Sequence, residues 1–236
     1  IRDSAAGVQA LAVAMQASKD TINIADRIKA QAHRRSEAQA VVEQMVADGR
    51  AGPMNHAFVS RILSEEAGDD AAVFSELGAT GPAMRLTRPG QLYRTPHSGG
   101  LGWGLPAALG AKLAEPGRTA IATVGDGSYM FANPTACHQV AAAHDLPVLT
   151  VVFNNGRWQA VKRATLGMYP DGLAAGSNEM PLTALGPSPD YSLIARAHGA
   201  HAERVEEPAE LRDAIRRALR EVRENGRQAL LDVLVA

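Results

Sequence analysis

The sequence has a single cysteine, few aromatic residues and no excess of charge of either sign. Because Cys137 is alone among the 236 residues, no disulfide can form within the chain, which favours a reducing compartment and predicts a cytoplasmic protein. Lysine and arginine number 24 against 25 acidic residues. No basic run and no acidic tail occurs, so nothing in the charge pattern indicates a nucleic-acid partner.

Long hydrophobic runs and a secretory leader are also missing. The longest apolar runs, such as residues 147–153, have the length of a strand and are too short to span a bilayer. The sequence opens with Ile1-Arg2-Asp3, without the basic and apolar regions of a signal peptide and without methionine. We therefore expect no association with a membrane, and we expect the natural start of the protein to lie upstream of Ile1.

The first fifty residues differ in composition from the rest. The stretch Asp26–Gly49 is rich in Ala, Glu, Gln and Arg, which are good helix formers, and its two end residues suit a helix N-cap and a C-terminal stop. No heptad pattern is sustained, so a connecting helix is favoured over a coiled coil. We predict that residues 1–52 form a helical linker or the end of a preceding domain, and that residues 53–236 form the main domain.

From residue 55 onward, helix-like and strand-like segments alternate. Strands are predicted at residues 71–74, 119–124, 148–153 and 229–235, and helices at residues 55–68, 105–114, 134–143, 191–198 and 209–224. Near-continuous apolar strands separated by helices are typical of an α/β fold, a doubly wound parallel sheet with helices on both faces. Such sheets bind ligands at the carboxyl ends of their strands. The long segment 167–189 shows no pattern, which is typical of either a functional lid or a disordered stretch.

Two of the predicted strands end in unusual polar sequences. One runs into Gly125-Asp126-Gly127-Ser128 and the other into Asn154-Asn155-Gly156. An aspartate between glycines exposes a carboxylate and leaves backbone N–H groups open to an anion, and a nearby asparagine oxygen completes a set of donors that suits magnesium. The helix at 134–143 begins too late to be the sole anion cradle, so we expect the backbone of Gly127 and Ser128 to hold the anion.

The order of these motifs resembles that of thiamine diphosphate-dependent enzymes of the acetolactate synthase and benzoylformate decarboxylase type. The sequence GDGS, then about thirty residues, then NN at a strand end is similar to the motif of that family, and the stretch 99–108 (GGLGWGLPAA) matches the segment that precedes it. The resemblance implies that residues 53–236 are the C-terminal domain, which binds the diphosphate of thiamine diphosphate and Mg²⁺.

The resemblance also implies a role for individual residues. Asp126 and Asn155 would ligate Mg²⁺ through their side chains and Arg157 through its backbone carbonyl. The remaining cofactor contacts would come from the polar strand ends and from the segment before them: Gly78, Ala79, Gly99, Leu101, Gly125, Gly127 and Ser128. Leu101 would be the apolar wedge that bends the cofactor, and the Gly99 carbonyl would accept a hydrogen bond from its aminopyrimidine.

Fewer residues point to the substrate. Ala160 and Val161 match positions that line the substrate pocket in the family, and their small side chains favour a branched or aromatic substituent over pyruvate. Trp158 either stacks over the pocket or packs the start of a helix. His97 is either a general acid/base facing the reacting carbon or a loop histidine bonded to the backbone.

For the whole enzyme the resemblance implies decarboxylation of a small-molecule 2-oxo acid, with or without carboligation, in a homodimer or homotetramer. Alternatives are a thiamine-dependent lyase acting on a 2-hydroxyacyl-CoA or an acyloin, and a non-catalytic regulatory or assembly domain. The family's activating glutamate lies on a pyrimidine-binding domain of the same or a neighbouring subunit, and nothing here resembles that domain. We therefore expect the isolated chain to be inactive. FAD, which some relatives bind, is left open.

A dinucleotide-binding site is the remaining alternative. Gly102-x-Gly104-x-x-Ala107 fits the G-x-G-x-x-A pattern, and Asp126 follows about twenty residues later. That pattern requires a strand directly before the first glycine, and residues 94–98 do not read as one. It also leaves Asn154 and Asn155 unexplained, so this interpretation is disfavoured.

Overall fold

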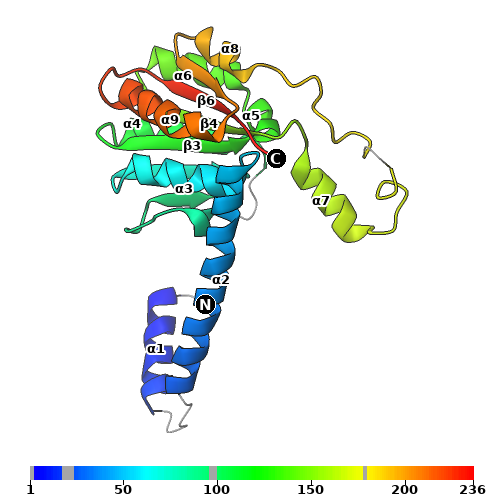
Figure 1. Cartoon of the computed structure of the whole chain (residues 1–236). Helices are drawn as coiled ribbons and strands as arrows, with labels where there is room; N and C mark the ends of the chain where they lie inside the picture. The colour runs from blue at the N-terminus through cyan, green and yellow to red at the C-terminus, as the bar shows by residue number, and fades with distance from the viewer. Residues whose placement is uncertain (1–2, 18–23, 96–99, 178–179) are drawn as a thin grey trace. The chain divides into compact units, whose positions relative to one another are not determined.

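A computed structural model describes residues 3–17, 24–95, 100–177 and 180–236. The chain divides into two compact units, residues 1–41 and residues 42–236 (Figure 1). The division falls inside a helix, because the last turns of that helix bury Val46 and Gly49 in the second unit. The boundary expected after residue 52 on sequence grounds stays a prediction.

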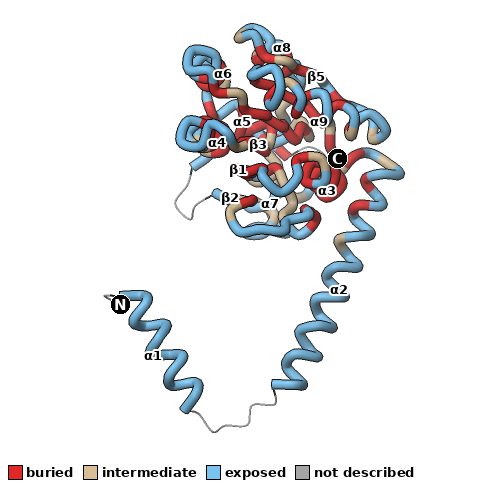
Figure 2. The backbone as a smooth tube through the Cα atoms, turned by 90° about the vertical axis from the view of Figure 1, so that its left-hand side faces the viewer, coloured by how far each residue is buried: buried red, intermediate tan, exposed pale blue. Residues whose placement is uncertain are grey.

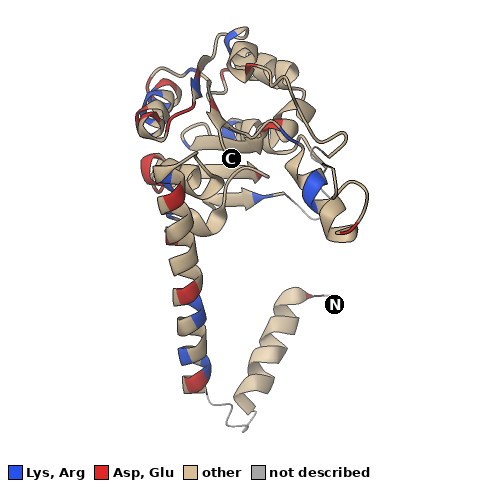
Figure 3. Cartoon of the chain, turned by 45° about the vertical axis from the view of Figure 1, so that its right-hand side comes forward, with Lys and Arg blue, Asp and Glu red and all other residues tan. Residues whose placement is uncertain are grey.

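The first unit consists of α1 (Ser4–Ala17) and the beginning of α2 (Ile24–Ala51). Every residue described between 3 and 41 is exposed. Figure 3 shows that α2 carries mixed charges whereas α1 carries none within its bounds. The sequence predicted α2 and did not predict α1.

The second unit is built on a six-stranded sheet with the order β2-β1-β3-β4-β6-β5. All five pairings are parallel. The strands are β1 (Ala71–Glu76), β2 (Leu92–Arg94), β3 (Thr119–Gly125), β4 (Leu149–Asn154), β5 (His201–Val205) and β6 (Ala229–Leu234). Parallel strands need long crossovers, and helices supply most of them.

Helices cover both faces of the sheet, as Figure 1 shows. One face is covered by α3 (His56–Ala67) and α9 (Pro208–Arg223) and the other by α4 (Gly104–Ala114), α5 (Asp126–Phe131), α6 (Pro134–Ala143) and α8 (Tyr191–Arg196). A 3₁₀ turn, η1 (Gly81–Ala83), follows β1, and α7 (Gln159–Met168) follows β4. This arrangement confirms the predicted doubly wound α/β fold.

Alternation along the strands divides the interior into two apolar cores. On β4, Leu149, Val151 and Phe153 pack toward α3 and α9, whereas Val152 packs toward α4 and α6. Every residue of β4 is buried, and Figure 2 shows the buried chain concentrated in the sheet and on the inner faces of its helices. This double burial explains why the strands are apolar without alternation in the sequence.

The predicted elements between residues 55 and 235 are confirmed, with ends shifted by a few residues. Asn55 caps α3 by accepting a hydrogen bond from the Phe58 N–H, and Gly68 ends that helix at φ 70°. Three elements of this unit beyond the 3₁₀ turn were not singled out: the short edge strands β2 and β5 and helix α7. A fourth, α5, is taken up with the site below.

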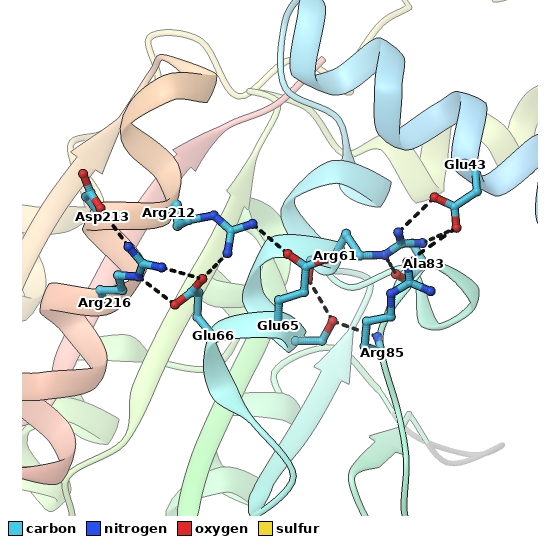
Figure 4. Close-up of polar contacts among 10 residues, drawn as sticks. Glu43, Arg61, Glu65, Glu66, Ala83, Arg85, Arg212, Asp213 and Arg216 are labelled. Atoms are coloured by element: carbon cyan, nitrogen blue, oxygen red, sulfur yellow. Dashed lines mark hydrogen bonds and ion pairs between the residues drawn. The ribbon is translucent and has the colours of Figure 1, made fainter.

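Two separate groups of ion pairs connect α3 to α2 and α3 to α9 (Figure 4). The Arg61 guanidinium donates to both carboxylate oxygens of Glu43, at 3.0 and 2.9 Å. Arg212 contacts Glu65 at 2.7 Å and also pairs with Glu66, which Arg216 contacts at 2.8 Å. These ion pairs connect the helices that pack over the apolar core containing Leu149, Val151 and Phe153.

Candidate functional site

The polar strand ends meet at one edge of the sheet. Because β3 and β4 are parallel neighbours, the turns that follow them lie side by side. One carboxylate oxygen of Asp126 accepts hydrogen bonds from the backbone N–H of Asn155, at 3.2 Å, and of Arg157, at 3.3 Å. The GDGS and NN motifs therefore form one structural unit.

Asp126 is the first residue of α5 and is only 3% exposed. Its other carboxylate oxygen accepts the Gly127 N–H at 2.8 Å. Burial raises the pKa of this carboxyl group, and the surrounding backbone N–H groups oppose that rise. The next helix was expected at Pro134, and this expectation was wrong, because Asp126–Phe131 already form a helix. The last three residues of the GDGS motif are its first turn.

These turns open onto a cleft of about 500 Å³, part of which is open to solvent. Its wall contains ten of the residues predicted from the sequence: Leu101, Gly125, Asp126, Gly127, Ser128, Asn155, Arg157, Trp158, Ala160 and Val161. Also in the wall are His56, Leu77, Phe153, Gln159 and Arg163. Segments that lie far apart in the sequence thus converge on one space.

Two of the predicted residues that the structure describes, Gly78 and Ala79, are not in this wall. Gly78 and Ala79 lie directly behind Leu77; the Gly78 carbonyl is bonded to His56, and the Ala79 N–H donates to the Ser75 hydroxyl. His97 and Gly99 lie outside the described residues. Their predicted roles, as acid/base and as aminopyrimidine acceptor, remain predictions.

Trp158 lies directly over Gly127. A Cβ atom on Gly127 would approach the Trp158 ring to 2.3 Å, so only glycine fits beneath the indole. The ring is held from another side by Phe131, at 5.6 Å and nearly perpendicular. Trp158 therefore packs the first turn of α5 as well as lining the cleft.

The donor atoms at this edge suit a hard cation. Asp126 offers a carboxylate, Asn155 an amide oxygen and Arg157 a backbone carbonyl, which are the oxygen ligands that magnesium prefers. In the described part of the chain, no group of three or more His, Cys, Asp or Glu side chains could hold a metal ion. A cation here would accordingly depend on amide and carbonyl oxygens and on oxygens that a ligand brings.

The same edge has a polar group suited to an anion. The Ser128 hydroxyl is buried and has no hydrogen-bond partner among the described residues. Buried hydroxyl groups are normally satisfied, and an unsatisfied one calls for an explanation such as a missing ligand. A phosphate oxygen in the cleft would accept its hydrogen bond, so Ser128 fits the diphosphate group that the resemblance implies.

Two residues of this edge were missed in the sequence. The His56 Nδ1–H donates to the Gly78 carbonyl at 2.7 Å, and its ring stacks on Phe153 with 4.9 Å between centroids. Burial lowers the pKa of His56, so the ring is neutral near pH 7. α3 leads into the amino end of β1, so the start of α3 lies near the carboxyl edge of the sheet. This position at the start of the helix was the one signal in the sequence that could have indicated His56.

Glu76 is the second missed residue. It ends β1, is 1% exposed, and its two carboxylate oxygens accept the N–H groups of Gly102 at 2.6 Å and Gly104 at 2.5 Å. These bonds fix the loop that presents Leu101 to the cleft and begin α4. A charged residue at the end of an otherwise apolar strand was the signal that could have revealed it.

The segment after α7 packs against the turn at residues 154–158. The Leu185 N–H donates to the Gly156 carbonyl and the Trp158 N–H to the Thr183 carbonyl, both at 2.8 Å. Within the described parts of residues 169–189 there is no helix or strand beyond an isolated bridge between Arg157 and Ala184. Gly167 and Met168, predicted as loop, are the last residues of α7. The described residues after them are irregular as predicted, and the later part is anchored at the site.

Comparison with known proteins agrees with this geometry. The family model described as "Thiamine pyrophosphate enzyme, C-terminal TPP binding domain" matches residues 77–233. The chain is 34% identical to benzoylformate decarboxylase of Pseudomonas aeruginosa, over 71% of this chain and 30% of that protein. It is also 34% identical to the acetolactate synthase isozyme 3 large subunit of Escherichia coli, over 70% of this chain and 28% of that protein.

A solved structure extends the comparison to three dimensions. The thiamine diphosphate-dependent 4-hydroxybenzoylformate decarboxylase of Rhodococcus jostii RHA1 superposes with a TM-score of 0.64 at 29% identity, over 78% of this chain and 32% of that one. The chain thus spans less than a third of the length of each of these relatives. With the family model matched over most of the second unit, the chain belongs to the thiamine diphosphate-dependent enzymes and contains their C-terminal cofactor-binding domain.

Proposed function

We propose that this chain is the diphosphate- and Mg²⁺-binding part of a 2-oxo acid decarboxylase or carboligase. The observation that carries the proposal is the convergence, in one cleft, of the Asp126 carboxylate, the Asn155 amide and the unsatisfied Ser128 hydroxyl. Anion and cation donors side by side at the carboxyl edge of a parallel sheet suit a metal–diphosphate pair.

The proposed roles follow from these positions. Asp126, Asn155 and the Arg157 carbonyl hold Mg²⁺, while Ser128 and the backbone around Gly125 and Gly127 hold the diphosphate. When bound, thiamine diphosphate supplies a nucleophilic carbon that attacks carbonyl groups. Leu101, on the loop fixed by Glu76, would supply an apolar contact to the cofactor. Gly78 and Ala79 follow Leu77, which lines the cleft, and are proposed as further contacts to the cofactor.

The substrate is proposed to be a small 2-oxo acid that reaches the cleft beside α7. Ala160 and Val161 line it with small side chains, and Trp158 closes one wall. This shape supports a branched or aromatic substituent. His97 as acid/base, a pyrimidine-binding domain on the same or a neighbouring subunit, and a homodimer or homotetramer complete the proposal; FAD depends on parts of the enzyme beyond this domain.

The test is calorimetric titration of thiamine diphosphate with Mg²⁺ into the wild-type protein and an Asp126→Ala variant. We expect metal-dependent binding that the substitution abolishes. Asp213→Ala is the matched control, because Asp213 is an exposed carboxylate on α9, outside the cleft. This control should bind as the wild type does.

The outcomes separate the alternatives. Metal-dependent binding lost only in Asp126→Ala supports the site, and activity on 2-oxo acids in the full assembly then identifies the reaction. Turnover of a 2-hydroxyacyl-CoA or an acyloin, with none of a 2-oxo acid, would replace the decarboxylase by the lyase. Absence of binding in the full assembly would overturn the enzyme proposal in favour of a non-catalytic domain.

A further inference from the structure

A buried carboxylate on another strand is hydrogen-bonded, through one intervening side chain, to the turn that contains Asn155 and Arg157. Asp232 lies on β6, next to β4 in the sheet, and is fully buried. Its Oδ1 accepts a hydrogen bond from the Asn154 Nδ2 at 2.9 Å. Asn154, in turn, accepts the Gly156 N–H on its Oδ1 at 3.1 Å.

This chain of bonds has a direction. A carboxylate without a proton can only accept hydrogen bonds, so it requires the NH₂ side of the Asn154 amide to face β6. The amide oxygen must then face Gly156, whose N–H can only donate. Asp232 thereby fixes which way the Asn154 side chain points.

The Gly156 N–H is a sensitive point of the turn. Gly156 has φ 65°, a left-handed conformation that glycine adopts readily, and it separates Asn155 from Arg157. In this conformation the N–H groups of both neighbours reach the same oxygen of Asp126. Holding Gly156 therefore aims the turn at Asp126.

Two further features support a dedicated role for Asp232. Its Oδ2 has no hydrogen bond within the described residues, and the nearest cation, Arg204, is 3.8 Å away. Keeping a buried carboxylate so incompletely compensated is unfavourable for folding. Ser188, from the segment after α7, also bonds Asn154, at 3.2 Å, so the network reaches that segment as well.

We propose that Asp232 is a positioning residue of the metal site, acting through Asn154 on the conformation of the turn at residues 154–157. The inference rests on the proposed function, since it assumes that this turn binds Mg²⁺. Asp232 touches neither the metal nor the substrate in this role. Loss of such supporting bonds typically lowers metal affinity on the order of tenfold to a hundredfold.

The experiment measures Mg²⁺ affinity at saturating thiamine diphosphate, by calorimetry, in the native assembly. Asp232→Ala should raise the Mg²⁺ dissociation constant on the order of tenfold or more. Asp232→Asn should restore most of the affinity, because its amide oxygen still accepts the Asn154 N–H. Ser188→Ala removes an exposed member of the network, so it tests the idea without a buried change and should weaken Mg²⁺ severalfold.

Gln228→Ala is the matched structural control. Gln228 begins the same strand region, is buried, and bonds His138 and the His198 carbonyl, at the opposite end of β6. Its loss should lower stability and leave Mg²⁺ affinity unchanged, which separates positioning from general destabilisation.

Two results would contradict the inference. Equal Mg²⁺ affinity in wild type, Asp232→Asn and Ser188→Ala, together with wild-type affinity in whatever Asp232→Ala protein folds, would show that Asp232 serves only stability. A loss of Mg²⁺ affinity in Gln228→Ala as large as that in Asp232→Ala would also show that Asp232 acts only through general stability. A wild-type protein that binds no cofactor would instead overturn the proposed function itself.

Discussion

Two clusters of polar side chains in the second unit differ in how their hydrogen-bonding capacity is used. In the cluster between α3 and α9, the guanidinium groups of Arg212 and Arg216 meet the carboxylates of Glu65 and Glu66, and both arginines are partly open to solvent (Figure 4). At the carboxyl edge, Asp126, Ser128 and Asp232 are buried, and the last two have an atom with no hydrogen bond within the described chain.

The difference separates a structural cluster from a functional one. Surface ion pairs contribute little free energy each and can be lost without consequence for a site. Buried polar groups that are unsatisfied within the chain cost folding free energy and persist where a ligand or a mechanism needs them. The comparison therefore predicts large effects from changes at the edge and small ones from changes at the ion pairs.

The largest effect is expected in the pH dependence of stability at Asp232. Burial raises its pKa to about 6, although Asn154 and Arg204 oppose the rise. With the folded pKa above the ordinary 3.8, the folded state holds this proton more tightly, so stability falls as pH rises from 4 to 6. Between pH 3 and pH 7, a range that spans both pKa values, the wild type should lose about 3 kcal/mol relative to Asp232→Asn.

Urea unfolding of both proteins at several pH values measures that difference, since other groups contribute equally to each. If the free energies of unfolding of the two proteins change equally with pH, Asp232 has an ordinary pKa. The contrast between the buried polar groups of the edge and the ion pairs would then not hold for Asp232.

The next largest effect is expected from Glu76→Gln. An amide can accept only one of the two N–H groups of Gly102 and Gly104, and it turns a donor toward the other. Loss of one charge-assisted bond with a buried N–H left unpaired should cost about 2 kcal/mol of unfolding free energy. Thiamine diphosphate should also bind more weakly, because the loop that carries Leu101 loosens. Glu115→Gln, at the exposed end of α4, is the control and should change neither.

Gly127→Ala should have a slightly smaller effect on folding. The new methyl group must displace the Trp158 ring, and overpacking of this kind costs about 1–2 kcal/mol. A shift in tryptophan fluorescence should accompany it. Combining the change with Trp158→Ala should recover part of the loss, because the clash is removed. Purely additive effects in the double variant would show that the two residues do not conflict.

The smallest effect is expected in the ion-pair cluster. Arg212→Gln removes the contacts with Glu65 and Glu66, which are partly exposed. The free energy of unfolding should fall by less than about 1 kcal/mol, and by less still at high salt. Cofactor binding should not change. A loss as large as that of Glu76→Gln would remove the distinction between the two clusters.

Much of the fold could be predicted because burial on both faces gives the central strands a strong apolar signal. β1, β3, β4 and β6 follow from it. β5 was missed because it lies at the edge of the sheet, where three of its five residues are not buried. α5 was missed because its six residues begin with a Gly-rich motif typical of a loop, and only the end of β3 makes the first turn possible.

The candidate site divides in the same way. Local motifs indicated Asp126, Ser128 and Asn155, since a turn of this composition at a strand end has few other uses. His56, Glu76 and Asp232 belong to no such motif. Glu76 and Asp232 reach the edge through the order of the strands, with pairs such as Val152 and Asp232 joining residues far apart in the chain. His56 reaches it from the first position of α3. That order is a property of packing, which a single sequence does not display.

No helix in the described part of the chain is long and apolar enough to cross a membrane. This agrees with the short apolar runs of the sequence. The cytoplasmic location expected from the lone Cys137 stays a prediction.

The backbone bonds that fasten Thr183 and Leu185 to the turn at Gly156 and Trp158 have a consequence for divergence among relatives. Insertions between the end of α7 and this anchor lengthen a loop whose closure costs little more for each added residue. Changes within residues 183–188 act directly on the turn at residues 154–158. The length of the stretch after Met168 can therefore change without moving the turn, whereas a change in the anchor acts on the turn itself.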